Sequence, residues 1–150
     1  MALDLGWRWS ALLGKKKRPQ VILLDTNALL WLDREHPRGR VLRRAKASLY
    51  VSPVNLLELQ FLCEASRIRL RKGSTIASLG QDPRWLFDDP PSAAWFAKAL
   101  DVNFTRDPFD RLLVAHARYR GWRLATGDGQ LIAHLGPGEA AVGGGIWHPA

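Results

Sequence analysis

The chain has 150 residues, enough for one domain with one sizeable core, and 47% of them are hydrophobic, which excludes a disordered chain. A single cysteine excludes an internal disulfide, and no apolar run approaches the ~20 residues that a membrane-spanning helix needs. The net charge of +8 is compatible with an anionic partner such as nucleic acid.

Residues 1–20 are predicted to be a basic extension, and residues 21–150 the folded domain. The extension carries five Lys and Arg residues against Asp4. Its charges follow the apolar part, which is the wrong order for a secretory signal, so we expect a cytoplasmic protein. Four apolar side chains of the extension could form one face of a short helix: Trp7, Trp9, Leu12 and Leu13. Such a helix could dock on the domain, meet a partner or lie on a membrane surface, and docking is the favoured alternative.

The stretch Val21–Leu24 has four aliphatic residues in a row and predicts a short strand buried on both faces. Asp25, Thr26 and Asn27 follow where this strand should end, and apolar residues then resume in a predicted helix at 28–32. In open α/β sheets, ligands bind at the carboxyl ends of the strands. Asp25 is therefore either the N-cap of that helix or an acid at a strand tip.

A second helix is predicted at 41–48, with a basic face, and a second strand at 49–52. Pro53 suits the first turn of a third helix, at 54–65, which is apolar nearly all round and should be central and buried. Inside it lies Glu58. A buried carboxylate is costly unless it is paired, so Glu58 is either the partner of an arginine or a metal ligand.

Further helices are predicted from Ser74 to Leu79 and from Ala93 to Leu100, with Ser74 and Ser92 as caps. Between them, the residues at 85–87 (Trp-Leu-Phe) should anchor the connection in the core. No internal repeat or low-complexity segment separates these elements.

Asp107 and Pro108 form a good helix start, as N-cap and first helical residue, and Gly121 ends that helix. Asp110 in its first turn gains from the helix dipole by only roughly 0.3–1 kcal/mol, so a functional role stays open. A strand at 122–126 then stops at Asp128, which repeats the situation of Asp25. A short helix at 131–135 and an edge strand at Ile146-Trp147 complete the prediction.

The alternation of strands and helices predicts a parallel sheet, in which the acids at two strand tips converge if the strands are neighbours. At an effective dielectric of ~20, each close pair of carboxylates costs roughly 3 kcal/mol, so such a cluster requires protonation or bound divalent cations. Carboxylate sites with open positions suit Mg²⁺ or Mn²⁺, and those ions serve phosphodiester hydrolysis.

Four segments in this order resemble the PIN-domain nucleases, and within them the VapC-like toxins of toxin–antitoxin pairs. They are residues 24–31 (LDTNALLW), 52–60 (SPVNLLELQ), 105–115 (TRDPFDRLLVA) and 124–128 (LATGD). The resemblance spans about residue 21 to 148, with Ile146-Trp147 as the terminal strand. It implies a three-layer α/β/α sandwich with a central, mostly parallel sheet.

The resemblance also implies the site. The acidic quartet of the family falls on Asp25, Glu58, Asp110 and Asp128, which would bind one or two Mg²⁺ or Mn²⁺ ions for RNA hydrolysis. Supporting residues are Thr26, Asn27, Asp107 and Thr126. Many relatives carry a further acid where this chain has Gly129-Gln130. The lack of that acid would make the binding of a second metal ion less firm.

The implied partners are an RNA substrate, an antitoxin that covers the acidic site and a second copy of the chain. Phosphate contacts need cations but not a precise spacing of them. The candidates are Arg106, Arg111, Arg40 and Arg43. Two alternatives remain: a non-catalytic PIN-like module that binds RNA or protein, and a DNA-directed nuclease on the same fold. The presence of all four acids argues against the first.

Overall fold

The computed structural model describes residues 20–141. At its centre is a five-stranded sheet in the order β3-β2-β1-β4-β5, and every pairing between neighbours is parallel. The strands are β1 (Gln20–Leu24), β2 (Ala47–Val51), β3 (Leu86–Phe87), β4 (Arg123–Ala125) and β5 (Ala140–Ala141).

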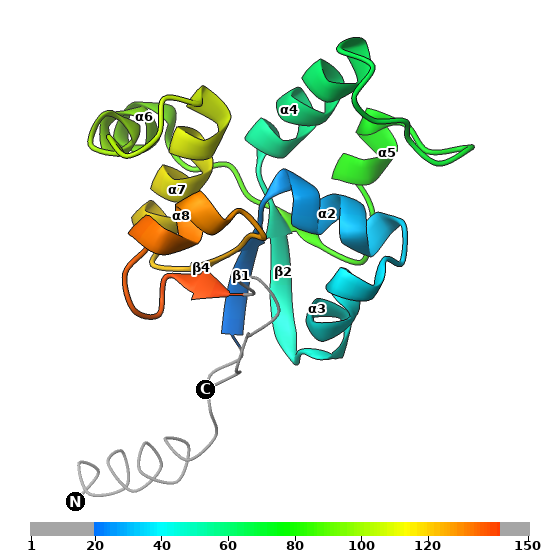
Figure 1. The fold of residues 1–150 in the computed structure, drawn as a ribbon, viewed down its shortest axis with the longest axis horizontal. Coiled ribbons are helices and arrows are strands. Elements are labelled where there is room, and N and C mark those ends of the chain that lie inside the picture. The colour runs from blue at the N-terminus through cyan, green and yellow to red at the C-terminus, as the bar shows by residue number, and fades with distance from the viewer. Residues whose placement is uncertain (1–19, 142–150) are drawn as a thin grey trace, which may run out of the picture.

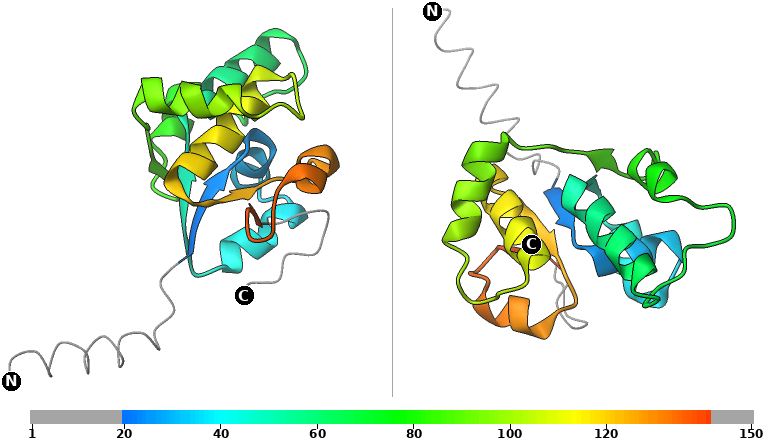
Figure 2. Two further views of the ribbon diagram at one scale, coloured as in Figure 1. Left: turned by 90° about the vertical axis from the view of Figure 1, so that its left-hand side faces the viewer. Right: turned by 90° about the horizontal axis from the view of Figure 1, so that it is seen from above.

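Helices cover both faces of this sheet (Figures 1 and 2). They are α2 (Thr26–Asp33), the 3₁₀ turn η1 (Pro37–Gly39), α3 (Arg40–Arg44), α4 (Pro53–Glu64), α5 (Ile76–Gly80), α6 (Ser92–Leu100), α7 (Pro108–Arg120) and α8 (Gly129–His134). Helices α2, α3 and α5 lie to one side of the strands in Figure 1, and α6, α7 and α8 to the other. The predicted α/β/α sandwich is confirmed.

Strand β1 is central because its sequence suits burial on both faces. Ile22, Leu23 and Leu24 are all fully buried. Successive side chains of a strand point to opposite faces. Ile22 and Leu24 accordingly join the core beneath α2, α3 and α5, whereas Leu23 joins the core beneath α6, α7 and α8.

The predicted helix ends are largely confirmed. Asp107 caps α7 with Pro108 as its first residue, and Pro53 is the first residue of α4, behind Ser52, which caps the helix instead of ending the second strand. Gly121 ends α7 in the left-handed conformation with φ +69°, which residues with a β-carbon rarely adopt. The cap of α5 is Thr75 rather than Ser74, and α6 begins at Ser92 itself, behind Pro91.

The prediction of a helix at 41–48 is wrong at its second half. Helix α3 ends at Arg44, and Ala45 is already extended with ψ 135°. The reason is tertiary: Ala47 and Ser48 pair with Gln20 and Val21 of β1, and this ladder draws them into β2. The second strand therefore covers 47–51 rather than 49–52, and β4 is likewise shorter than predicted.

The prediction that α4 is buried all round is also wrong. Only Val54, Asn55 and Leu59 are buried, while Leu57 is 63% exposed and Phe61 47% exposed. The helix packs mainly against α5 and α7, so one apolar stripe meets the core and a second faces outward.

Similarly, Trp85 is buried as expected, but Leu86 and Phe87 are about half exposed. They form β3, which sits at the edge of the sheet beside β2. The predicted strand at Ile146-Trp147 lies outside the described residues, and the last described strand is β5. Within 20–141, no helix has the length and apolar character to cross a membrane.

Candidate functional site

Two acids meet at the carboxyl edge of the sheet because their strands are neighbours. Leu24 at the end of β1 pairs with Ala125 at the end of β4, and Asp25, the residue directly after β1, donates its backbone N–H to the Ala125 carbonyl at 2.9 Å. Asp128 follows β4 by three residues. This is the convergence that the parallel sheet predicts.

A pocket of about 190 Å³ opens at this edge. Its walls come from α2, α4, α7 and the residues that cap α2, α7 and α8, which bring together segments distant in sequence. The residues that line it are Asp25, Thr26, Asn27, Glu58, Leu62, Asp107, Asp110, Leu113 and Asp128. All four acids of the predicted quartet are among them, together with Asp107.

Asp25 is both a helix cap and a pocket acid, so its two alternatives are not exclusive. Its Oδ1 accepts the backbone N–H of Ala28 at 2.7 Å, while the residue is only 6% exposed. Burial raises the pKa of the Asp25 carboxyl to about 6, and the charges of Glu58 and Asp128 add to the rise. Hydrogen bonds from Thr126 and Ala28 oppose it.

Asp110 and Glu58 face the same pocket from α7 and α4. Burial, followed by repulsion from Asp107 and Glu58, raises the pKa of Asp110 to about 7. Burial also raises the pKa of Glu58, against a hydrogen bond from Thr26. The site thus holds protons that an isolated carboxyl group would release well below neutral pH.

Carboxylate oxygens of Glu58, Asp107 and Asp110 lie within 4.8 Å of one another. Asp107 therefore stands beside two members of the quartet, although its Oδ1 is engaged as a cap by the N–H groups of Phe109 and Asp110. None of the ion pairs within residues 20–141 involves any of the five acids. An all-oxygen donor set without a protein cation fits a hard divalent ion such as Mg²⁺ or Mn²⁺.

Two buried threonines hold the acids in place. The Thr126 hydroxyl accepts the backbone N–H of Asp128 at 3.0 Å and also hydrogen-bonds Asp25, so it links the acids of the two strand tips. The Thr26 hydroxyl hydrogen-bonds the Glu58 carboxylate in the same way. Asn27 lines the pocket but is exposed.

One residue of the site was missed by the sequence analysis. Asn55 is fully buried and donates from its amide to the Leu24 carbonyl at 3.0 Å and to the Thr26 hydroxyl at 3.3 Å. Its Oδ1 accepts the N–H of Ser52 at 2.7 Å, which closes a capping box. The spacing of Ser52 and Asn55 is the signal that sequence reasoning could have used.

The predicted arginines do not gather at the pocket. Arg106 is exposed beside Asp107, and Arg111 donates its Nε–H to the Thr105 carbonyl at 2.7 Å. Arg40 and Arg43 lie on α3, and Arg43 lines a different pocket, beside β2.

Comparison with known proteins identifies the fold. A family model described as "PIN domain" matches residues 22–135. The chain is 34% identical over 128 residues to "Ribonuclease VapC22" of Mycobacterium tuberculosis, which covers 81% of this chain and 97% of that protein. The chain belongs to the PIN-domain family, and within it to the VapC-type ribonucleases.

Solved structures with this fold include a toxin–antitoxin complex from Klebsiella pneumoniae, with a TM-score of 0.58, 16% identity and coverage of 78% of this chain and 93% of that one. VapBC2 from Rickettsia felis, bound to a DNA fragment from its promoter, also has a TM-score of 0.58, with 17% identity and coverage of 83% and 98%.

Proposed function

We propose that this protein is a metal-dependent endoribonuclease that acts as the toxin of a toxin–antitoxin pair. One observation carries the proposal: five carboxylates face one small pocket without a cation from residues 20–141, and burial raises the pKa of Asp25 to about 6 and of Asp110 to about 7. Such a cluster is stable at neutral pH only with protons or with bound cations. The similarity to Ribonuclease VapC22 supports RNA as the substrate.

In this proposal Asp25, Glu58, Asp110 and Asp128 hold one or two Mg²⁺ or Mn²⁺ ions, and Asp107 is a further candidate ligand through its Oδ2. A bound divalent ion would lower the pKa of water and stabilise charge on a phosphodiester. The chain itself orients the acids through the Thr26 and Thr126 hydroxyls. It also keeps Asp25 away from bulk water, which strengthens its interaction with a cation.

Four arginines are candidates for contacts with the phosphates of the RNA backbone. Arg106 is exposed beside Asp107 of the pocket and would reach a phosphate there, whereas Arg111 would act mainly by fixing the loop before α7. Arg40 and Arg43 would meet only an RNA that extends to the other end of α2. Each phosphate contact contributes to a salt-dependent affinity rather than to sequence preference.

The proposed partners are an antitoxin and a second copy of the chain. The solved toxin–antitoxin complexes with this fold support the first. For the second we propose the outward apolar side chains of α4 and α6, two helices that both pack against α7; these side chains are Leu57, Phe61, Phe96 and Leu100. We further propose that the protein acts in the cytoplasm, and that residues 1–20 are an extension to one PIN domain over 21–150.

The test is to incubate the purified protein with total RNA in Mg²⁺, in Mn²⁺ and in EDTA, beside Asp25→Asn and the matched control Asp101→Asn. Asp101 is an exposed acid at the end of α6 and does not line the pocket. We expect discrete cleavage that requires metal, is lost in Asp25→Asn and persists in the control. Single-stranded and duplex DNA of similar length serve as competing substrates.

Cleavage by Asp25→Asn at the parental rate would contradict the site. Cleavage of DNA alone would replace RNA as the substrate. Absence of both cleavage and calorimetric metal binding would favour a non-catalytic RNA- or protein-binding module.

A further inference from the structure

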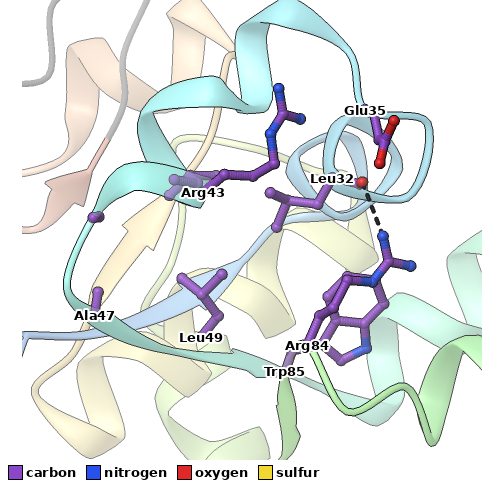
Figure 3. A pocket seen from close by; sticks show the side chains of 9 residues that line it. Leu32, Glu35, Arg43, Ala47, Leu49, Arg84 and Trp85 are labelled. Carbon is purple, nitrogen blue, oxygen red and sulfur yellow. Dashed lines mark hydrogen bonds between the residues drawn. The ribbon is translucent and has the colours of Figure 1, made fainter.

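A second pocket, of about 310 Å³, lies at the C-terminal end of α2, between α3 and β2 (Figure 3). It shares no residue with the acidic pocket. The residues that line it are Leu32, Glu35, Leu42, Arg43, Ala45, Ala47, Leu49, Arg84 and Trp85. We call it the α3 groove. Its volume would hold about ten water molecules at ~30 Å³ each, which is room for one indole ring.

The floor of the α3 groove is apolar and preformed. Leu32, Leu42 and Trp85 are each at most 4% exposed, so their positions are set by the core. One wall is Arg84, whose guanidinium lies 4.6 Å from the ring centre of Trp85 and donates to the Leu32 carbonyl at 3.1 Å, as Figure 3 shows. Arg84 is also paired with Asp33 at 3.0 Å and Asp82 at 2.7 Å. This wall is therefore rigid and its charge is neutralised.

The chain enters the fold directly beside this groove. Gln20, the first described residue, pairs with Ala47, which lines the groove. Gln20 also lies on the same face of the sheet as the groove, because Ile22 shares its alternation and joins the core that Ala47 and Leu49 contact. The segment that precedes Gln20 is thus tethered next to an apolar opening.

That segment carries the apolar side chains noted in the sequence: Trp7, Trp9, Leu12 and Leu13. Leu13 precedes Gln20 by seven residues, which span up to about 25 Å when extended, against about 5 Å between neighbouring strands. A short tether gives an effective concentration in the millimolar range. Each buried tryptophan removes about 150–250 Å² from water.

We propose that residues 7–13 of this chain dock in the α3 groove. A tryptophan ring of this segment would lie between Arg43 on one side and the side chains of Leu42 and Leu49 on the other. Arg43 donates to the His36 carbonyl at 3.3 Å and has no acidic partner within residues 20–141, so its guanidinium is available to stack on an indole. The proposal does not depend on nuclease activity.

Charge gives this occupant a distinctive signature. The tether is basic, with four consecutive cations at 15–18. Within residues 20–141, the arginines of α3 outnumber the single unpaired acid of the groove, Glu35, so tether and groove repel each other. Docking must therefore come from apolar burial. It should strengthen when salt shortens the Debye length from about 10 Å at 0.1 M to about 3 Å at 1 M, whereas an acidic peptide in the groove would bind more weakly.

The test uses the full chain with Cys63→Ser, which removes its single cysteine, and Ser10→Cys, which carries a spin label. We expect the amide NMR signals of Ala45, Ala47 and Leu49 to lose most of their intensity, and more so at high salt. Adding Trp7→Ser and Trp9→Ser should restore these signals. The matched Trp147→Ser change, at the other end of the chain, should leave the broadening in place.

Four outcomes would overturn the proposal. The groove signals could stay sharp, or their broadening could survive the double tryptophan change. Broadening could also arise between molecules. If spin-labelled protein without ¹⁵N broadened the signals of ¹⁵N-enriched protein that carries no spin label, the groove would be assigned to a second copy. A label at Gly144→Cys could broaden the same signals instead, which would assign the groove to the C-terminal segment.

Discussion

The indole ring of Trp31 packs directly on the α-carbon of Gly127, so that a β-carbon at position 127 would lie 2.9 Å or less from the ring. Gly127 separates Thr126 from Asp128, whose backbone N–H donates to the Thr126 hydroxyl. A residue of α2 that is far from Asp128 in sequence therefore determines how the chain passes from β4 to Asp128.

We predict that Gly127→Ala lowers RNA cleavage by about tenfold or more and weakens metal binding, because the added methyl group displaces Trp31 or the loop that carries Asp128. Overpacking of this kind typically costs about 1–3 kcal/mol. Cleavage rates and calorimetric titration with Mn²⁺ measure the two effects. Adding Trp31→Leu should recover part of the activity.

Gly129→Ala is the matched control, since nothing lies within 4 Å of a β-carbon at that position. It should keep parental activity. Equal losses in the two glycine variants would show that loop flexibility, rather than contact with Trp31, governs the site.

Asn55→Ala should destabilise the protein by about 2–4 kcal/mol, because it leaves the buried Leu24 carbonyl, Thr26 hydroxyl and Ser52 N–H without their partner. Urea unfolding measures the change. Gln60→Ala on the same helix removes only an exposed contact to Glu64 and should change stability by less than about 0.5 kcal/mol. A similar effect of both substitutions would contradict the positioning role of Asn55.

In the metal-free protein, the raised pKa values of Asp25 (about 6) and Asp110 (about 7) have a definite consequence for stability. The folded state holds protons that the unfolded chain releases near pH 4, so these groups lower the free energy of unfolding as pH rises from about 4 to about 7. Thermal melting in EDTA across this range measures the effect.

Asp110→Asn should flatten that slope and stabilise the metal-free protein by roughly 1 kcal/mol at pH 7.5, a figure discounted because the group is partly solvated. Asp101→Asn should keep the parental slope. Mg²⁺ should stabilise the parent far more than Asp110→Asn, through mass action on the folded state. If the melting temperature of the parent changed with neither pH nor Mg²⁺, the claim that this acidic cluster binds protons and metal ions would be contradicted.

Leu57→Arg should convert the proposed dimer to a monomer without loss of fold, because Leu57 is 63% exposed in the single chain and its removal leaves no cavity. Leu100→Arg, at a residue that is 77% exposed, should act in the same way. Light scattering during gel filtration gives the mass. A parent that is already monomeric at high concentration would show that this apolar surface serves another partner.

Local chemistry in the sequence determined much of this protein. The buried character of β1, the caps Asp25 and Asp107, Pro108 in the first turn and the glycine stop at Gly121 were all predicted, since each depends on interactions within a few residues. The convergence of Asp25 and Asp128 also followed from the sequence, because parallel strands with right-handed crossovers place their carboxyl ends at one edge.

Tertiary structure alone decided the rest. It brought Asp107 next to Glu58 and gave Asn55 its buried partners, since these contacts join a helix to a second helix or to the end of β1, and no local pattern connects such elements. It turned Leu57 outward, because apolar periodicity reveals that stripes exist but not which of them meets the core. It also ended α3 at Arg44, where pairing with β1 outweighs the high helix propensity of Ala45, Lys46 and Ala47.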